Sequence, residues 1–460
     1  MSLALRLGQF SAGVAQHEVT LSTRLKSAGA LLDTLAVTVA GRNEAASHLA
    51  LNYLAEMHGI GGGRGGASLW GRTEKLSVEH AALWNGISGH VLDYDDVTPP
   101  LSGHPSVAMF PALVALAESF ALPVSRLHTA YVVGLECIVR LATALNPAHY
   151  RKGWHSTASI GSIGCAVACS KLLDLSAGKT AHAIGLAVAQ AAGTRMNFGS
   201  HAKSFQAGNA NAIGVRSALL ARQGFESGPD SLDVQGGYAG LYGDGVDLDT
   251  AFADIGRTRW AIDEVGLDVK KYPLCYGTHR TLDGLFDMIA KHGFQMRDIE
   301  QVHVHTSYGQ LTPLIHSRPK TGLEAKFSMQ YAVAAAVLDG RVRLASFTDE
   351  AVQRPAIQAF FDRIRVDCAA ESEDNARWSE VTVQLLDGLR HATRVTELRG
   401  SSQHPLRADE LRGKVQDCLD WGRIRADASV LSECILSPDE RSVTELMAAV
   451  NELINIKDAV

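Results

Sequence analysis

The sequence contains few cysteines and no excess of basic residues. Its 460 residues include seven cysteines, an odd number scattered along the chain, and no two CxxC pairs occur at zinc-ligand spacing. The sequence therefore supports neither a disulfide scaffold nor a zinc ribbon, and we expect reduced thiols. Acidic residues (49) outnumber basic ones (43), which gives a net charge of −6 and argues against a nucleic-acid partner. A hydrophobic content of 46% with 20% charged residues is typical of a globular protein and compatible with a metabolic enzyme.

Targeting and membrane-spanning signals are also lacking. The N-terminal segment has no basic region, and polar residues interrupt its apolar stretch too early for a signal peptide. The longest uncharged run, residues 153–170, consists largely of Gly, Ala, Ser and Thr. It predicts a close-packed buried helix rather than a membrane span. We therefore expect a cytoplasmic protein with no membrane partner.

Familiar cofactor and nucleophile motifs are missing as well. The glycine cluster 61–66 formally satisfies GxGxxG, but a helical pattern precedes it where a dinucleotide-binding motif needs a strand. It is therefore predicted to be a surface loop. No GxSxG elbow and no HExxH helix occurs.

The first part of the chain has a helical pattern almost throughout. Apolar residues recur at three- and four-residue spacing between residues 20 and 266, and strand-like alternation is absent there. Many of these segments are rich in Ala and Gly, so their helices can approach closely. The pattern predicts a large all-α domain over residues 1–266, with helices at 25–39, 45–57, 77–92, 107–121, 125–145, 155–173, 180–192 and 207–223.

Alternating apolar residues appear only after residue 267. Strands are predicted around residues 302–305, 364–366, 381–385 and 391–395, and Asp387-Gly388 predicts a hairpin between the last two. Helical patterns at 281–292, 326–339 and 348–363 lie among them. This mixture predicts a small α+β domain with an antiparallel sheet over residues 267–405. The C-terminal helices, residues 406–460, are expected to pack back on the all-α domain.

The loop after the helix at 77–92 is a candidate catalytic segment. Asp93, Asp95 and Asp96 follow the end of that helix, where the helix dipole disfavours negative charge. A rigid loop through Pro99 and Pro100 then presents His104. A loop with aspartate turns is the alternative reading. Without further spaced ligands or an EF-hand glycine, a metal site is not predicted.

Two further segments place polar side chains at helix starts. His155, flanked by Trp154 and Ser156, precedes the Gly/Ala-rich helix and is a candidate general base; a capping or core histidine is the alternative. Lys203 lies before another small-residue helix, where positive potential suits a carboxylate. A solvated lysine is the alternative there.

A second basic cluster lies at the predicted domain junction, a favoured position for small-molecule sites. It contains Lys270, Lys271 and Arg280, together with Cys275 and His279. Pro273 and Gly277 predict irregular backbone between the last two, which disfavours a Cys–His catalytic pair.

Taken together, these segments resemble the MmgE/PrpD family over nearly the whole chain. The matching stretches are HVLDYDD (90–96), GHPSV (103–107), GWHSTASIGSIGCA (153–166), KSFQAGNANAIGV (203–215), KKYPLCYGTHRTLDG (270–284) and KFSMQYAVAAAVLDG (326–340). The family includes 2-methylcitrate dehydratases, cis-aconitate decarboxylases and iminodisuccinate epimerases. The resemblance implies a large all-α domain with a smaller α+β lid domain, a homodimer, and no redox cofactor.

The resemblance also implies site residues. Asp93, His104 and His155 correspond to an aspartate and two histidines used by the decarboxylase branch, and Lys203 and Lys270 correspond to its catalytic lysines. Substrate contacts are expected from Thr98, Gln206, Lys270, Cys275, His279 and Arg280. Two departures argue against decarboxylation of cis-aconitate, because Val97 replaces a threonine and Cys275 a histidine.

The expected function is that of a cofactor-independent lyase of the dehydratase type. It would act on a small di- or tricarboxylate by proton abstraction next to a carboxylate, as in 2-methylcitrate dehydratases. Two alternatives stay open: an epimerase of an iminodisuccinate-like dicarboxylate, and a non-catalytic carboxylate-binding member of the family.

Overall fold

The computed structural model describes residues 1–59, 66–232, 236–256, 259–307, 309, 311–370, 377–437 and 440–454. Nearly all of the glycine cluster 61–66, predicted to be a surface loop, lies outside these ranges. The chain divides into two compact units. Unit 1 comprises Met1–Asn197, His201–Asp268 and Cys418–Val460, and unit 2 comprises Phe198–Ser200 and Val269–Asp417.

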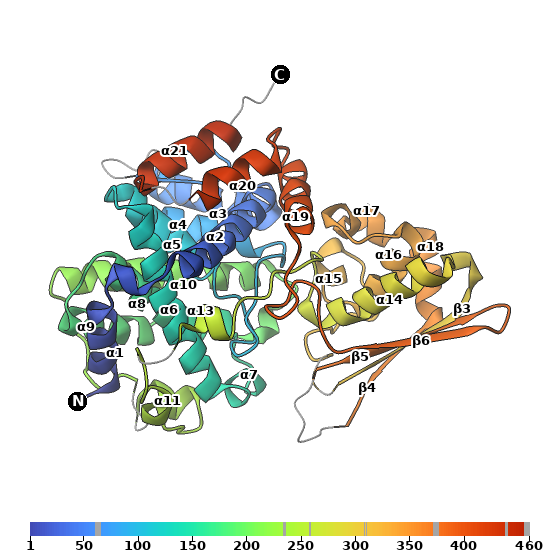
Figure 1. Ribbon diagram of the computed structural model, residues 1–460, viewed down its shortest axis with the longest axis horizontal. Helices are drawn as coiled ribbons and strands as arrows, with labels where there is room; N and C mark the ends of the chain where they lie inside the picture. Colours follow the sequence, from blue (N-terminus) through green and yellow to red (C-terminus); the bar gives the residue numbers. More distant parts are fainter. Residues whose placement is uncertain are drawn as a thin grey trace. The chain divides into compact units, whose positions relative to one another are not determined.

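Unit 1 is helical, as predicted (Figure 1). Each of the eight helices expected in the first part of the chain is present, with ends that differ by a few residues. The helices of unit 1 are α1 (Leu3–Gly13), α2 (Leu21–Gly41), α3 (Ala45–His58), α4 (Val78–His90), α5 (Phe110–Ser119), α6 (Val124–Leu145), α7 (Ala148–Arg151), α8 (Ser156–Leu172), α9 (Ala177–Val188), α10 (His201–Arg222), α11 (Tyr238–Tyr242), α12 (Leu248–Ala251), α13 (Ala261–Glu264), α20 (Ala428–Leu436) and α21 (Val443–Ile454).

One prediction for this part of the chain was wrong. Two strands, β1 (Ala67–Ser68) and β2 (Lys75–Leu76), form an antiparallel pair where no strand was expected. With two residues each, they are too short to produce an alternating pattern in the sequence.

Small residues let the central helices of unit 1 approach closely. A Cβ atom at Gly86 of α4 would lie 2.7 Å from the Cα of Gly208 in α10, and one at Gly214 of α10 would lie 2.3 Å from the Sγ of Cys165 in α8. Any larger residue would push these helices apart. Helix α10 therefore packs directly against both α4 and α8, two helices whose ends carry candidate residues.

Helix α8 is buried along almost its entire length, as predicted for the uncharged run 153–170. Helix α6 is long and apolar enough to cross a membrane by length and composition, but 83% of its apolar stretch is buried inside the protein. Such burial is the normal property of a core helix. None of the seven cysteines, all of which are described, forms a disulfide.

Unit 2 is built on a four-stranded sheet in the order β4-β3-β5-β6. Its strands are β3 (Ile299–Thr306), β4 (Ile364–Cys368), β5 (Ser379–Leu385) and β6 (Arg390–Val395), all in predicted segments. Helices α14 (His279–His292) and α16 (Met329–Asp339) cover one face of the sheet (Figure 1). The shorter α15 (Gly322–Ala325) lies in the same unit, whereas α19 (Ala408–Trp421) crosses from unit 2 into unit 1.

The sheet is mixed rather than wholly antiparallel. β5 pairs antiparallel with β3 and with β6, and Gly388 (φ 88°) turns the predicted β5–β6 hairpin. β4, however, runs parallel to β3. Alternation in a sequence reports that a strand is half-buried but not its direction, and the long helical connection between β3 and β4 permits the parallel arrangement.

The helix predicted over residues 348–363 is divided in two. α17 (Asp349–Val352) ends before Pro355, and α18 (Pro355–Phe360) begins at that proline. Arg354 is extended, at φ −53° and ψ 128°. Proline disfavours the helical conformation of the residue before it, and it has no N–H with which to continue the helix.

Candidate active site

The candidate catalytic loop begins where α4 ends. Asp93 adopts a left-handed conformation with φ 52°, and its N–H donates to the carbonyl of His90 at 3.2 Å. Aspartate is one of the few non-glycine residues that tolerate this conformation, which terminates the helix. Thr98 bonds to the carbonyl of Gly103 at 3.1 Å, and the N–H of His104 donates to Oγ1 of Thr157 at 3.0 Å. These contacts hold the loop against the start of α8.

The close approach of α4 and α10 brings two of the site's residues together. His90 lies four residues after Gly86 in α4, and Lys203 lies five residues before Gly208 in α10. Because the two glycines meet where the helices cross, the end of α4 is next to the beginning of α10. The Nζ of Lys203 consequently lies 3.0 Å from Nε2 of His90.

Five buried ionisable side chains form a closed ring. Lys203 donates to Nε2 of His90 and, at 2.7 Å, to Oδ1 of Asp93. Oδ2 of Asp95 is 2.9 Å from Nδ1 of His90 and 3.1 Å from Nδ1 of His104. Nε2 of His104 lies 3.5 Å from Oδ1 of Asp93 and closes the ring. All five residues are at most 7% exposed, so these charges interact with little solvent screening.

His155 lies beside this ring and is oriented by α10. The centroid of its imidazole lies 5.8 Å from that of His90. Its Nδ1 lies 2.6 Å from Oε1 of Gln206, whose Nε2 donates to the carbonyl of Thr194 at 3.2 Å. Although His155 is the N-cap residue of α8, its side chain makes no capping hydrogen bond. The capping alternative therefore does not describe this side chain.

Burial and neighbouring charges set the protonation states of the site. Burial, reinforced by Lys203 and His104 and only partly opposed by Asp95, lowers the pKa of His90 to about 4. Burial, with the charges of His90 and Lys203, also lowers the pKa of His155 well below 6.5. Burial alone would raise the pKa of Asp95, but the two imidazoles bonded to it bring that pKa well below 3.8. At neutral pH, His90 and His155 are neutral and Asp95 is ionised.

The unusual acidic cluster after α4 is thus explained by three different sets of partners. Asp93 bonds to Lys203, and Asp95 bonds to two histidines. The third carboxylate, Asp96, accepts from the hydroxyl of Ser106 and, at 3.4 Å, from its N–H. These contacts offset the unfavourable position of the carboxylates at a helix C-terminus.

Four predicted catalytic residues are therefore brought together in unit 1, with Gln206 beside them. Sequence reasoning missed His90 and Asp95 as members of the site, although both lie in the HVLDYDD motif. The available signal was the five-residue separation of His90 and Asp95 across a helix end, which lets the chain turn back on itself. Thr98 is buried, and its hydroxyl donates to the carbonyl of Gly266 at 3.3 Å, so this contact supports the loop.

One group in the described part of the chain offers three potential metal ligands. Ligand atoms of His90, Asp95 and His104 lie within 4.8 Å of one another. A cation bound there would lie close to the ammonium group of Lys203, which is 3.0 Å from His90. Like charges at such separations repel strongly in a buried site, so the donor set fits a hydrogen-bonded cluster better than a metal centre.

The four remaining predicted residues belong to unit 2. Lys270 is 1% exposed and Cys275 7% exposed, and the N–H of Cys275 donates to the carbonyl of Lys326 at 2.9 Å. His279 begins α14, with Nε2 3.3 Å from the carbonyl of Leu274. Nε of Arg280 donates to the carbonyl of Thr396 at 3.0 Å, just after β6. The guanidinium of Arg280 thus has a structural bond within its own unit.

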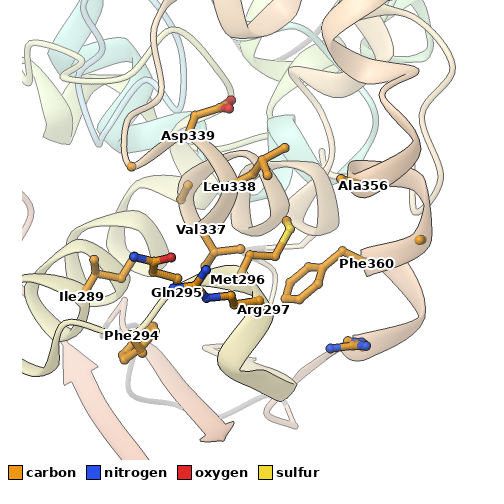
Figure 2. A pocket seen from close by; sticks show the side chains of 14 residues that line it. Ile289, Phe294, Gln295, Met296, Arg297, Val337, Leu338, Asp339, Ala356 and Phe360 are labelled. Carbon is orange, nitrogen blue, oxygen red and sulfur yellow. The ribbon is translucent and has the colours of Figure 1, made fainter. Parts of the chain in front are cut away.

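Unit 2 also contains a cavity of about 620 Å³ (Figure 2). Its lining is largely apolar and includes Ile289, Met296 and Phe360, and none of the ten predicted site residues takes part in it. The carboxylate in the lining, Asp339, is held by two 2.7 Å bonds from Arg354. This cavity has no acid–base pair comparable with the ring in unit 1.

Comparisons with known proteins find relatives that match most of the chain. Cis-aconitate decarboxylase of Homo sapiens is 28% identical over 379 residues, which cover 79% of this chain and 76% of the human protein. The Mus musculus enzyme of the same name is 27% identical over 399 residues, 83% of this chain and 79% of the mouse protein. The Cis-aconitate decarboxylase-like protein oryM of Aspergillus oryzae (strain ATCC 42149 / RIB 40) is 27% identical over 338 residues, 67% of this chain and 68% of that protein.

Two family models match consecutive parts of the chain. The model of the MmgE/PrpD N-terminal domain matches residues 5–251, and that of the MmgE/PrpD C-terminal domain matches residues 272–434. These matches confirm the resemblance found in the sequence motifs: the chain belongs to the MmgE/PrpD family.

Proposed function

We propose that the protein is a cofactor-independent lyase that removes a proton next to a carboxylate of a small di- or tricarboxylate. The observation that carries this proposal is the buried set of acid–base groups in unit 1, with a neutral His155 beside the ring. The names of the decarboxylase relatives support lyase chemistry on a tricarboxylate. Val97 and Cys275, the two departures from the decarboxylase pattern, favour elimination of water over loss of carbon dioxide.

His155 is the proposed general base. Since Gln206 donates its amide N–H to Thr194, its Oε1 faces His155 as an acceptor, and Nδ1 of the imidazole must carry the proton. The lone pair of the neutral His155 imidazole is then on Nε2. A histidine that is neutral at neutral pH and oriented in this way is suited to remove a proton from carbon.

The ring supplies the other functions needed for an elimination. Nε2 of His155 would take the proton from carbon, and the ammonium of Lys203 would stabilise the negative charge that develops on the carboxylate-bearing fragment. A carbon–carbon double bond then forms as the carbon–oxygen bond breaks. His104, protonated and paired with Asp93, would give its proton to the departing hydroxyl, which leaves as water.

The charge of the ring affects how an anionic substrate can bind. The two carboxylates of the ring outnumber its one ammonium group. A polyanionic substrate is therefore expected to bind together with a proton, and His104 beside Asp93 is the group that accepts it in this mechanism. Lys270, Cys275, His279 and Arg280 remain substrate-binding predictions that rest on the resemblance.

A single experiment separates the candidate reactions. The purified protein is incubated in D₂O with 2-methylcitrate, cis-aconitate and iminodisuccinate stereoisomers, and each mixture is followed by NMR. Formation of the dehydrated product, with deuterium appearing in the remaining substrate through the reverse reaction, supports the dehydratase proposal. Carbon dioxide release identifies a decarboxylase, inversion without elimination identifies an epimerase, and binding without any exchange or product favours the non-catalytic alternative.

A further inference from the structure

Asp95 was not among the predicted site residues, yet its carboxylate contacts both imidazoles of the ring. Its Oδ2 is 2.9 Å from Nδ1 of His90 and 3.1 Å from Nδ1 of His104. The side chain of Asp95 is fully buried. We infer that Asp95 is the positioning residue of the site: one carboxylate holds both imidazoles with the proton on Nδ1 and Nε2 facing Asp93 and Lys203. This inference rests on the proposed function for its catalytic consequence, but not for its structural content.

The donor and acceptor inventory requires this arrangement. An ionised carboxylate only accepts hydrogen bonds, so each Nδ1 at hydrogen-bond distance from it must carry a proton. The ammonium of Lys203 only donates, so the Nε2 of His90 facing it at 3.0 Å must be the unprotonated nitrogen. The contact of Nδ1 with Asp95 and the contact of Nε2 with Lys203 therefore require the same tautomer of His90. The lowered pKa values of Asp95 and His90 agree with an ionised Asp95 carboxylate and a neutral His90 imidazole.

The consequence for catalysis follows from which nitrogen is left to react. With Nδ1–H committed to Asp95, Nε2 of His104 takes up and releases the proton opposite Asp93, at 3.5 Å. His90 in turn accepts from Lys203 and fixes the direction of its ammonium. Asp95 thus acts on the reaction only through its neighbours, by orienting one acid–base group and one cation.

Replacing Asp95 with Leu keeps a side chain of similar size but removes both carboxylate oxygens. Asn would be a weaker probe, because both imidazoles contact the same oxygen, Oδ2, and an amide oxygen in that place could accept from both. Without the carboxylate, Nδ1 of His104 loses Oδ2 as an acceptor, and its Nε2 can carry the proton instead and donate to Asp93. In that tautomer Nε2 of His104 can no longer accept a proton.

The direct test is the tautomeric state of the histidines. Nitrogen NMR of the full-length protein labelled with ¹⁵N-histidine distinguishes Nδ1–H from Nε2–H rings, and the His90→Asn and His104→Asn variants assign the two signals. We expect Nδ1–H for both imidazoles in the unsubstituted protein and a change of at least one in Asp95→Leu. An Nε2–H ring at either position in the unsubstituted protein, or unchanged tautomers in the variant, would overturn the inference.

Kinetics test the consequence with a matched control. On whichever substrate the protein turns over, kcat of Asp95→Leu should fall roughly 10²–10⁴-fold with KM changed by less than about threefold. Asp96→Leu removes an equally buried carboxylate one residue further along, bonded to Ser106 outside the ring. It should retain kcat within about tenfold. Equal losses in both variants would contradict a positioning role. Because the NMR result needs no substrate, failure of the proposed function would still leave the inference independently testable.

Discussion

Nδ1 of His155 and Oε1 of Gln206 lie 2.6 Å apart, in a contact that joins the residue before α8 to the first turns of α10. The amide is itself held by the carbonyl of Thr194, so its oxygen cannot be exchanged for its nitrogen without losing a bond. The neutral amide of Gln206 thus determines which nitrogen of His155 reacts. Because the amide carries no charge, it does not raise the basicity of the His155 imidazole as a carboxylate would.

Substituting Gln206→Glu should therefore change the pH dependence of the reaction. A carboxylate accepting from Nδ1–H stabilises the protonated imidazole and raises the pKa of His155 from its lowered value. The base is then lost at higher pH, so kcat/KM at pH 5–6 should fall about tenfold or more relative to its value at pH 8. Gln190→Glu, two residues after the end of α9 and bonded to Arg216, serves as the control and should keep the original profile. Identical profiles for the two variants would refute the role assigned to Gln206.

Removal of the proposed base should lower turnover more than it lowers binding. His155→Ala is expected to reduce kcat by roughly 10²–10⁴-fold with a small change in KM. His128→Asn is a matched control, because His128 is also a buried histidine, bonded to Ser27 at 2.9 Å in a different part of unit 1. It should lose stability but keep kcat within about threefold. Near-normal turnover by His155→Ala would reject the assignment.

The spacing of apolar residues predicted most of the fold, because the buried faces of the helices and strands in this protein follow that spacing. The helices of unit 1 and the strands of unit 2 have the expected apolar spacing, and Asp387-Gly388 turns its hairpin as predicted. The periodicity of apolar residues does not report the direction of a strand or the exact length of a helix or strand. It therefore missed the parallel β4, the two-residue strands β1 and β2, and the interruption at Pro355, although the proline itself was visible.

The site was predicted in part for a related reason. His104 stood out in a rigid loop, His155 and Lys203 stood out beside small-residue helices, and the structure brings the three together. His90 and Asp95 did not stand out, because their importance depends on the crossing of α4 and α10 at Gly86 and Gly208. That crossing is a tertiary contact between residues more than a hundred positions apart, which no local pattern in one sequence reports.

The ion pair between Lys203 and Asp93 should be measurable as stability. Lys203→Met leaves a buried carboxylate without its cation, and the free energy of unfolding should fall by about 3–5 kcal/mol. The double variant Asp93→Asn/Lys203→Met should recover part of this loss. Five of the six tryptophans lie in unit 1, so denaturation followed by tryptophan fluorescence mainly reports this unit.

An exposed pair provides the comparison for that experiment. Lys26, whose side chain is 47% exposed, bonds to Asp263 at 2.7 Å. Lys26→Met should cost less than about 1 kcal/mol, because solvent screens the charges. If Lys203→Met cost no more than Lys26→Met, the buried ion pair would have no special energetic role.

Chelation should leave the activity unchanged. The ammonium of Lys203 lies 3.0 Å from His90, and its charge opposes binding of a cation by His90, Asp95 and His104. Dialysis against EDTA, followed by metal analysis and assay, should give a protein with less than about 0.1 metal equivalents and full turnover. Loss of activity that returns on adding a divalent cation would show that these three residues hold a metal after all.

Acidification should destabilise unit 1 before its carboxylates protonate. Burial lowers the pKa of both His90 and His128 to about 4, whereas a histidine in the unfolded chain has a pKa near 6.5. Between these values the unfolded state binds more protons than the folded state, so stability is complete above about pH 6.5 and declines as the pH falls toward 4. Each histidine contributes up to about 1.4 kcal/mol per pH unit to the slope of the free energy of unfolding against pH.

Urea denaturation at a series of pH values should show this decline, and His128→Asn should make it shallower. A stability that is constant from pH 7 to 4.5 would mean that these rings are protonated as easily in the folded protein as in water.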